Sequence, residues 1–142
     1  MHRIPLIIAS IGLIFISSCG KEEADPTVFK SPITILQPST DPANVIKGVP
    51  IKYDVRFTND EYIDSVMIYY QIDSLGTGYN TSIKDSLIKK VVYPLNERKN
   101  EQSLDGSFTP IAFPPVGKKI HLIFYLRSKT RDVSKRIPLI IT

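Results

Sequence analysis

The sequence predicts an all-β fold, an antiparallel sandwich of about seven short strands arranged in two sheets. Between positions 32 and 142, short runs of alternating apolar and polar residues are separated by turn residues such as proline, glycine, asparagine and aspartate. No stretch of this region has the roughly 3.6-residue apolar period of a helix. Because successive side chains of a strand point to opposite faces, the alternation places one face of each strand in a core.

The first three strands are expected at Ile33–Leu36, Ile51–Thr58 and Ile63–Ile72. Gln37–Pro42 follows the first strand and is rich in turn residues, and Asn59–Glu61 separates the second from the third. The alternation in the second and third strands assigns these side chains to the core: Ile51, Tyr53, Val55, Phe57, Val66, Ile68, Tyr70 and Ile72.

The next strand is expected within Leu87–Tyr93, although two adjacent valines interrupt its alternation and leave the register open. Residues 96–106 are polar and are expected to form an exposed loop. Ser107–Phe113 is expected to be a short strand at an edge or in an irregular position of a sheet, because Pro110 lacks the N–H group that a central strand donates. Val133–Ile141 is the last strand. The strand before it has Ile120, Leu122, Phe124 and Leu126 facing in and His121, Ile123, Tyr125 and Arg127 facing out.

This order of strands and turns resembles the Ig-like domains of bacterial surface proteins. The resemblance rests on Ile33–Pro38 followed by Gly48 and Ile51–Val55, on Ile63–Ile72, and on a closing hairpin with Asp132 at its turn. Val133 and Ser134 stand where such domains often carry a glycine after the aspartate, and the chain has no tryptophan and only one cysteine. The resemblance implies an Ig-like sandwich and brings no functional motif with it.

Residues 1–18 have the pattern of a secretory signal peptide, a basic start followed by an apolar run over Ile4–Ile16. This run is too short for a transmembrane helix, which needs about 20 residues. Ile16-Ser17-Ser18-Cys19 resembles the lipobox of bacterial lipoproteins, and Cys19 is the only cysteine of the chain. The resemblance implies cleavage before Cys19, a diacylglyceryl group on its sulfur, and a fatty acid such as palmitate on its new amino group.

Lys21, Glu22 and Glu23 follow the cysteine closely and resemble the lipoprotein export signal of Bacteroidota. This resemblance implies a lipid-anchored protein of the outer membrane, displayed on the cell surface. The alternative is a charged, soluble linker that carries no export signal. The expected organisation is therefore a signal peptide (1–18), a lipidated cysteine with a flexible tether (19–31), and one Ig-like β-sandwich domain (32–142).

The sequence offers no catalytic set. His121 is the only histidine after the signal peptide, no G-x-S-x-G motif occurs, and a zinc site needs three or four suitable ligands. Asn59, Asp60, Glu61 and Asp64 provide oxygen ligands of the kind calcium prefers, but Asn-Asp is also ordinary turn chemistry and the spacing is not that of an EF-hand. We therefore expect no metal, no cofactor and no enzymatic activity; an enzyme would need a cleft around Asp60, Asp64 or His121.

Positive charge is concentrated at the C-terminal end of the sequence. Residues 19–115 contain ten basic and thirteen acidic residues, whereas residues 116–142 contain seven basic residues and one acidic residue. The seven are Lys118, Lys119, Arg127, Lys129, Arg131, Lys135 and Arg136. They are expected to cluster at the two ends of the closing hairpin. They form either a patch for an anionic glycan or an acidic partner, or a guard against edge-to-edge aggregation of strands. The exported location and the lack of a recognisable module argue against nucleic acid.

Two further patterns concern the surface. If Tyr69 and Tyr125 lie on neighbouring strands, they form a small aromatic platform for a sugar ring, although tyrosine in a strand is often simply well packed. Asp-Ser followed by an apolar residue resembles the Bacteroidota O-glycosylation site, with Ser74 and Ser86 as the better candidates.

These observations favour a lipid-anchored, non-enzymatic binding or accessory module. The first hypothesis is docking to another envelope protein, and the alternative is a glycan-binding accessory lipoprotein of a polysaccharide-uptake system. The residues expected to line a binding surface are Tyr69, Tyr125, Lys118, Lys119, Arg127, Lys129 and Arg131.

Overall fold

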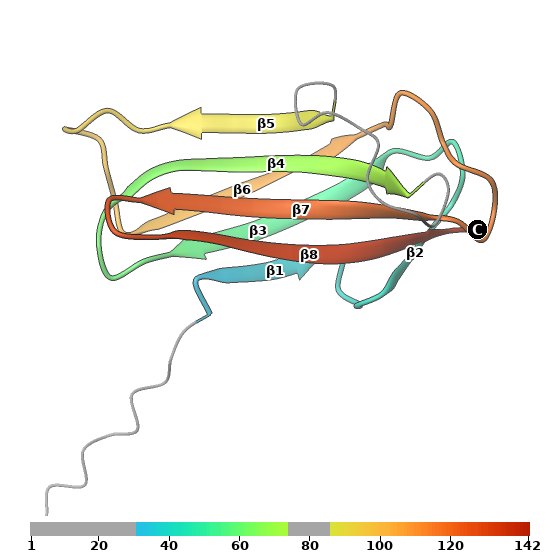
Figure 1. Ribbon diagram of the computed structural model, residues 1–142, viewed down its shortest axis with the longest axis horizontal. Coiled ribbons are helices and arrows are strands. Elements are labelled where there is room, and N and C mark those ends of the chain that lie inside the picture. Colours follow the sequence, from blue (N-terminus) through green and yellow to red (C-terminus); the bar gives the residue numbers. More distant parts are fainter. Residues whose placement is uncertain (1–30, 74–85) are drawn as a thin grey trace, which may run out of the picture.

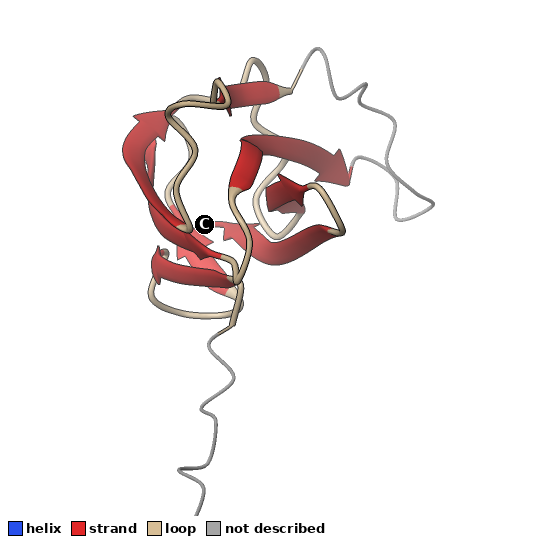
Figure 2. Cartoon of the chain, turned by 90° about the vertical axis from the view of Figure 1, so that its left-hand side faces the viewer, coloured by secondary structure: helices blue, strands red, loops and turns tan. Residues whose placement is uncertain are grey.

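A computed structural model describes residues 31–73 and 86–142 of the chain. Eight strands form two sheets that pack face to face, and the described residues contain no helix (Figures 1 and 2). No segment of this described part is therefore a helix able to cross a membrane. The strands are β1 (Ile33–Gln37), β2 (Ala43–Val45), β3 (Ile51–Thr58), β4 (Ile63–Asp73), β5 (Leu87–Val92), β6 (Glu101–Phe108), β7 (Lys119–Ser128) and β8 (Asp132–Ile141).

One sheet has the order β1-β3-β6 and the other the order β2-β8-β7-β4-β5. All pairs are antiparallel except β2 and β8, which run parallel. Strands β1, β3 and β6 occupy the places of strands A, B and E in an immunoglobulin domain, and β8, β7, β4 and β5 those of G, F, C and C′. The predicted Ig-like sandwich is thus confirmed, with eight strands rather than about seven.

The core lies between the two sheets and is built by the alternation seen in the sequence. On β3 the four apolar side chains are buried and the polar ones between them point outward. On β7 the inward residues pack against β3 and β4, and Phe57 and Phe124 are among the largest side chains that are fully buried. Burying each such side chain stabilises the fold by about 1.5–3 kcal/mol.

The prediction was wrong around β6. Residues 101–106, expected in a loop, form most of this strand, and residues 109–113 do not belong to a strand. The pattern is weak because β6 pairs only with β3 and is half exposed, so few of its residues need to be apolar. Gly106 lies opposite Tyr53, and a Cβ atom there would stand 2.7 Å from the tyrosine oxygen. Gly106 therefore weakens the strand pattern in the sequence, and its missing side chain leaves room for the Tyr53 ring.

β2 was not predicted at all. It has three residues, too few for an alternating pattern, and it is defined by its partner β8. Thr142 N–H donates to the Val45 carbonyl at 2.9 Å, and Lys47 N–H donates to the Thr142 carbonyl at 3.1 Å. A short segment after β1 is thereby held on the opposite sheet.

Different loops lie at the two ends of the sandwich (Figure 1). Thr58 N–H donates to the Pro32 carbonyl at 2.9 Å, so the start of the described domain lies beside loops 59–62, 93–100 and 129–131. We call this the proximal end. Loops 46–50 and 109–118 lie at the opposite end with Thr142, and we call this the distal end. Loop 46–50 is hydrogen-bonded to Thr142, and loop 109–118 is hydrogen-bonded to Ile141.

Candidate functional site

The outer face of the five-stranded sheet brings Tyr69 and Tyr125 together. Tyr69 on β4 pairs with Ile123 on β7, and the preceding outward residue, Met67, pairs with Tyr125. The two tyrosines are therefore diagonal neighbours on paired strands, within reach of each other's rings. Ile123 faces outward as expected but is buried between Tyr69 and Arg136, its partners on either side.

Both tyrosines line a hollow of about 310 Å³ on this face. It is a consequence of register: one row across the sheet is Val92-Ser65-Arg127, and the next is Lys90-Met67-Tyr125. The short Ser65 side chain stands among longer neighbours and leaves the space unfilled. We call this the sheet hollow, and it is lined by Ser65, Met67, Tyr69, Lys90, Tyr125 and Arg127.

Three side chains fix one wall of the sheet hollow. Tyr125 Oη donates to Asp132 Oδ2, and Arg127 Nε and Nη2 reach the two Asp132 carboxylate oxygens at 3.3 Å each. The Arg127 guanidinium also lies 5.9 Å from the centre of the Tyr125 ring. The hydrogen bond to Asp132 raises the pKa of Tyr125, and the bonds from Tyr125 and Arg127 lower the pKa of Asp132. The wall therefore keeps its charges and its geometry into mildly acidic solution.

The basic residues of the predicted surface lie at the two ends of the β7–β8 hairpin, as expected, and do not form one continuous patch. Lys118 and Lys119 lie at the distal end, whereas Lys129 and Arg131 lie at the proximal end, on the order of 30 Å away along β7. Arg131 is occupied, because its Nε and Nη2 donate to Asn59 Oδ1 at 3.0 and 2.7 Å. Arg127 alone of these five borders the sheet hollow.

The basic residues of β8 fit the guard against aggregation better than a binding patch. β2 pairs only with Leu139–Ile141, so among the described strands the edge of β8 from Asp132 to Pro138 has no partner. Lys135 and Arg136 are exposed on this stretch, and Pro138 lacks an N–H group. Charge and proline are features that blunt an open edge.

A second hollow, of about 430 Å³, lies at the proximal end around Asp60 and Asp64, where an enzyme would need its cleft. Its acidic groups are partly engaged: Asp64 pairs with Arg98 at 3.1 Å, and Glu61 accepts from Thr130 Oγ1 at 2.8 Å. Residues 31–73 and 86–142 contain no group of three or more metal-ligating side chains placed to hold an ion. His121 lies elsewhere, on the outer face of β7 opposite Gln71 and Pro138.

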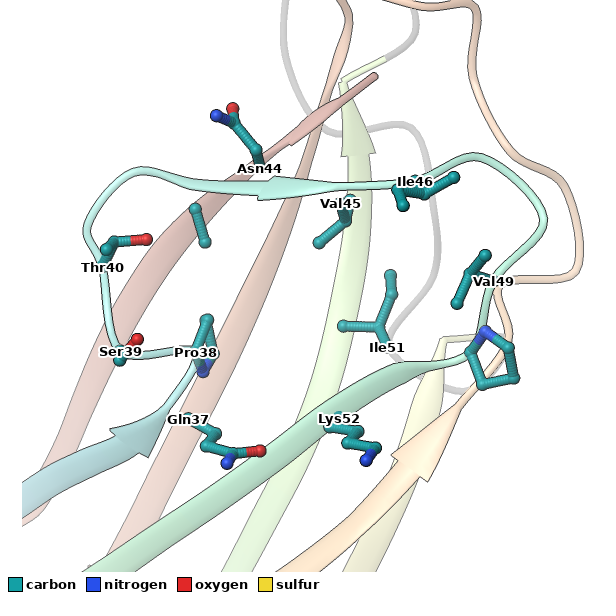
Figure 3. A pocket seen from close by; sticks show the side chains of 12 residues that line it. Gln37, Pro38, Ser39, Thr40, Asn44, Val45, Ile46, Val49, Ile51 and Lys52 are labelled. Carbon is teal, nitrogen blue, oxygen red and sulfur yellow. The ribbon is translucent and has the colours of Figure 1, made fainter.

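The distal end carries a surface that the sequence reasoning missed. Ile46, Val49, Ile111 and Val116 project from its loops with exposed fractions of 64, 47, 83 and 67%. Ile46 and Val49 border a hollow of about 400 Å³ between the β1–β2 connection, β2 and the start of β3 (Figure 3). The available signal was the occurrence of apolar residues beside prolines in loops, as in Val49-Pro50 and Pro115-Val116.

Several predicted sites lie outside the described residues: Cys19, the Lys21-Glu22-Glu23 segment and Ser74. Ser86 is described and is buried, and its carbonyl accepts from Tyr70 N–H at 3.0 Å. A glycosyltransferase would therefore have to reach the Ser86 hydroxyl before the domain folds.

Comparisons of the chain with protein-family models, with curated proteins and with solved structures found no match. The Ig-like architecture therefore rests on the order and pairing of the strands. What the surfaces do has to be argued from their own geometry and charge.

Proposed function

We propose that this chain is a lipid-anchored protein of the outer membrane, displayed on the cell surface, whose Ig-like domain is a non-enzymatic binding module for another envelope protein. The anchor is Cys19, and Lys21, Glu22 and Glu23 are the export signal. Three acyl chains exceed the two signals that stable anchoring requires.

The observation that carries the proposal is the position of the exposed apolar side chains. The chain enters the domain at the proximal end, and Ile46, Val49, Ile111 and Val116 project from two loops that are held together at the distal end. Tyr62, Val92 and Leu95 are also exposed, near the proximal end where the tether begins. Large apolar side chains gathered on one part of a surface are typical of interaction sites, whereas single scattered ones are not. A domain tethered at the proximal end would hold its apolar loops away from the membrane, where a partner can reach them.

The distal loops are also well held, which favours binding. Gly117 N–H donates to the Ile141 carbonyl at 2.8 Å, and Lys47 N–H donates to the Thr142 carbonyl. Prolines at 50, 110, 114 and 115 restrict the same loops. Loops that are ordered before binding lose less conformational entropy when a partner docks. Lys47, Lys118 and Lys119 flank the apolar residues and would favour an acidic rim on the partner.

The proximal hollow supports a non-enzymatic role. Its lining contains no serine, cysteine or histidine, so it offers no nucleophile paired with an imidazole base. Two of its three carboxylates already accept bonds from Arg98 and Thr130. These contacts connect loops, which is what a structural junction requires.

The experiment is recovery of the lipidated protein from crosslinked membranes of intact cells. We expect Ile111→Asp and Val116→Asp to abolish co-recovery of the envelope partner, because a buried unpaired carboxylate is costly at an apolar interface. Leu95→Asp is the matched control, since Leu95 is 81% exposed at the proximal end. Equal recovery of the same partner with all three variants would refute docking at the distal end.

A second candidate, glycan binding, is favoured by the sheet hollow with its two tyrosines and its flanking cations. It uses a different face of the domain from the distal loops. The two functions are therefore separable by mutation.

A further inference from the structure

The geometry points to a defined ligand class for the sheet hollow: a saccharide unit that carries a carboxylate, as a uronic acid does. The inference rests on the glycan-binding candidate above and is independent of docking at the distal end. Three features of the hollow lead to it: its aromatic walls, its charge, and its size.

The aromatic walls are Tyr69 and Tyr125. They come from adjacent strands and are partly exposed, so each offers part of a ring face and a hydroxyl group to the space between them. Tyrosine provides a large, rigid contact with little loss of side-chain entropy. Such a surface matches a sugar ring, which has apolar C–H faces and a polar edge.

The charge of the hollow is positive. Lys90 borders it on the β5 side and Arg127 on the β7 side, and no carboxylate is among its lining residues. Asp132, the acidic group of this wall, is already bound by Tyr125 and Arg127. A carboxylated sugar would give Lys90 an anionic partner and Arg127 a second one beside Asp132, whereas a neutral sugar would give neither.

Arg127 is prepared for this role. Its bonds to Asp132 and Tyr125 use the Nε and Nη2 atoms, so the N–H groups of Nη1 lie outside these bonds. Its side chain is 59% exposed despite being held on one side. A guanidinium whose orientation is fixed binds a carboxylate with good geometry and at a smaller entropic cost.

The size of the hollow limits what enters. A volume of about 310 Å³ is at the low end of the range for small-molecule sites, roughly 300–1,000 Å³. It accommodates a single charged sugar unit, with the rest of a chain running along the open face of the sheet. Ser65 at its floor is the residue whose short side chain creates the space.

The test is titration of the full lipidated chain, purified in detergent, with a tetramer of galacturonic acid and with the neutral galactose tetramer. We expect the acidic tetramer to bind at least tenfold more tightly, and added salt to weaken its binding. Arg127→Gln and Tyr69→Ala should each weaken it tenfold or more. Lys118→Gln, which removes the same charge at the distal end, should leave it unchanged.

Ser65→Phe is a second variant that separates loss of binding from misfolding. Its larger side chain faces outward and fills the hollow, and the substitution changes no charge. Loss of binding in Ser65→Phe at an unchanged melting temperature supports the site. Equal binding of both tetramers, no binding of either, or full binding by Arg127→Gln overturns the inference. Val116→Asp should leave saccharide binding intact, and Arg127→Gln should leave partner recovery intact, so the two proposals fail independently.

Discussion

Tyr125, Arg127 and Asp132 are joined by four side-chain hydrogen bonds on the outer face of the five-stranded sheet. Each side chain limits the rotamers of the other two, so the wall of the sheet hollow is shaped before any ligand arrives. Sequence reasoning identified Tyr125 and Arg127 as surface residues and placed Asp132 at a turn. It did not connect them, because Tyr125 and Asp132 meet only through the pairing of β7 with β8.

The titration of Tyr125 tests this group. We expect Asp132→Asn to lower the pKa of Tyr125 toward its ordinary value of about 10, because the hydrogen bond to Asp132 is the main cause that raises it. The raised pKa contributes stability below about pH 10 that is lost as the pH rises and Tyr125 ionises. NMR titration of labelled tyrosine rings measures the shift.

Tyr93 is the internal control, because its pKa is raised by burial and not by Asp132. An unchanged titration of Tyr125 in Asp132→Asn would mean that the hydrogen bond is absent in solution. A parallel change in Tyr93 would point to a general loosening of the domain.

Among the strands, predictability follows the environment of each one. β3 and β7 lie inside their sheets and present apolar side chains to the core at alternate positions, so their pattern is plain in the sequence. β6 is an edge strand with a glycine that accommodates Tyr53, and β2 is defined by its partner alone. The sheet hollow depends on the register of neighbouring strands. This register includes a shift in the pairing of β4 with β7 between Ile63 and Ser65, which no local sequence pattern encodes.

The Arg131 side chain joins two loops of the proximal end. Arg131 in the β7–β8 turn donates twice to Asn59, a buried residue of the β3–β4 loop. We expect Arg131→Ala to lower the free energy of unfolding by about 1–3 kcal/mol, because the Asn59 oxygen is left buried without its donors. Urea denaturation measures the change.

Lys129→Ala is the matched control in the same turn, and we expect it to change stability by no more than about 0.5 kcal/mol. If both variants lose the same stability, the bond to Asn59 is not what holds the loops together. The basic residue that sequence reasoning assigned to a binding surface would then be free to act in one.

For the whole molecule, the two ends of the sandwich give the domain a direction. The segment from Cys19 to Ser31 reaches at most roughly 45 Å when fully extended, and it joins the domain at the proximal end. The distal loops lie at the end opposite to this tether, and the sheet hollow lies along the side. The sequence predicts the anchor from a local motif, but the direction needs the fold, because it depends on which loops share an end.

The most direct test of this account is labelling of intact cells with a membrane-impermeant maleimide. Ser103→Cys adds a thiol on the outer face of the three-stranded sheet, away from both proposed binding surfaces, and Cys19 is the only natural cysteine. We predict that Ser103→Cys is labelled on intact cells and that the wild-type chain is not labelled even after lysis and denaturation, because its thiol carries lipid. Labelling of Ser103→Cys only after lysis would contradict surface display. Labelling of the wild-type chain would contradict the lipid anchor.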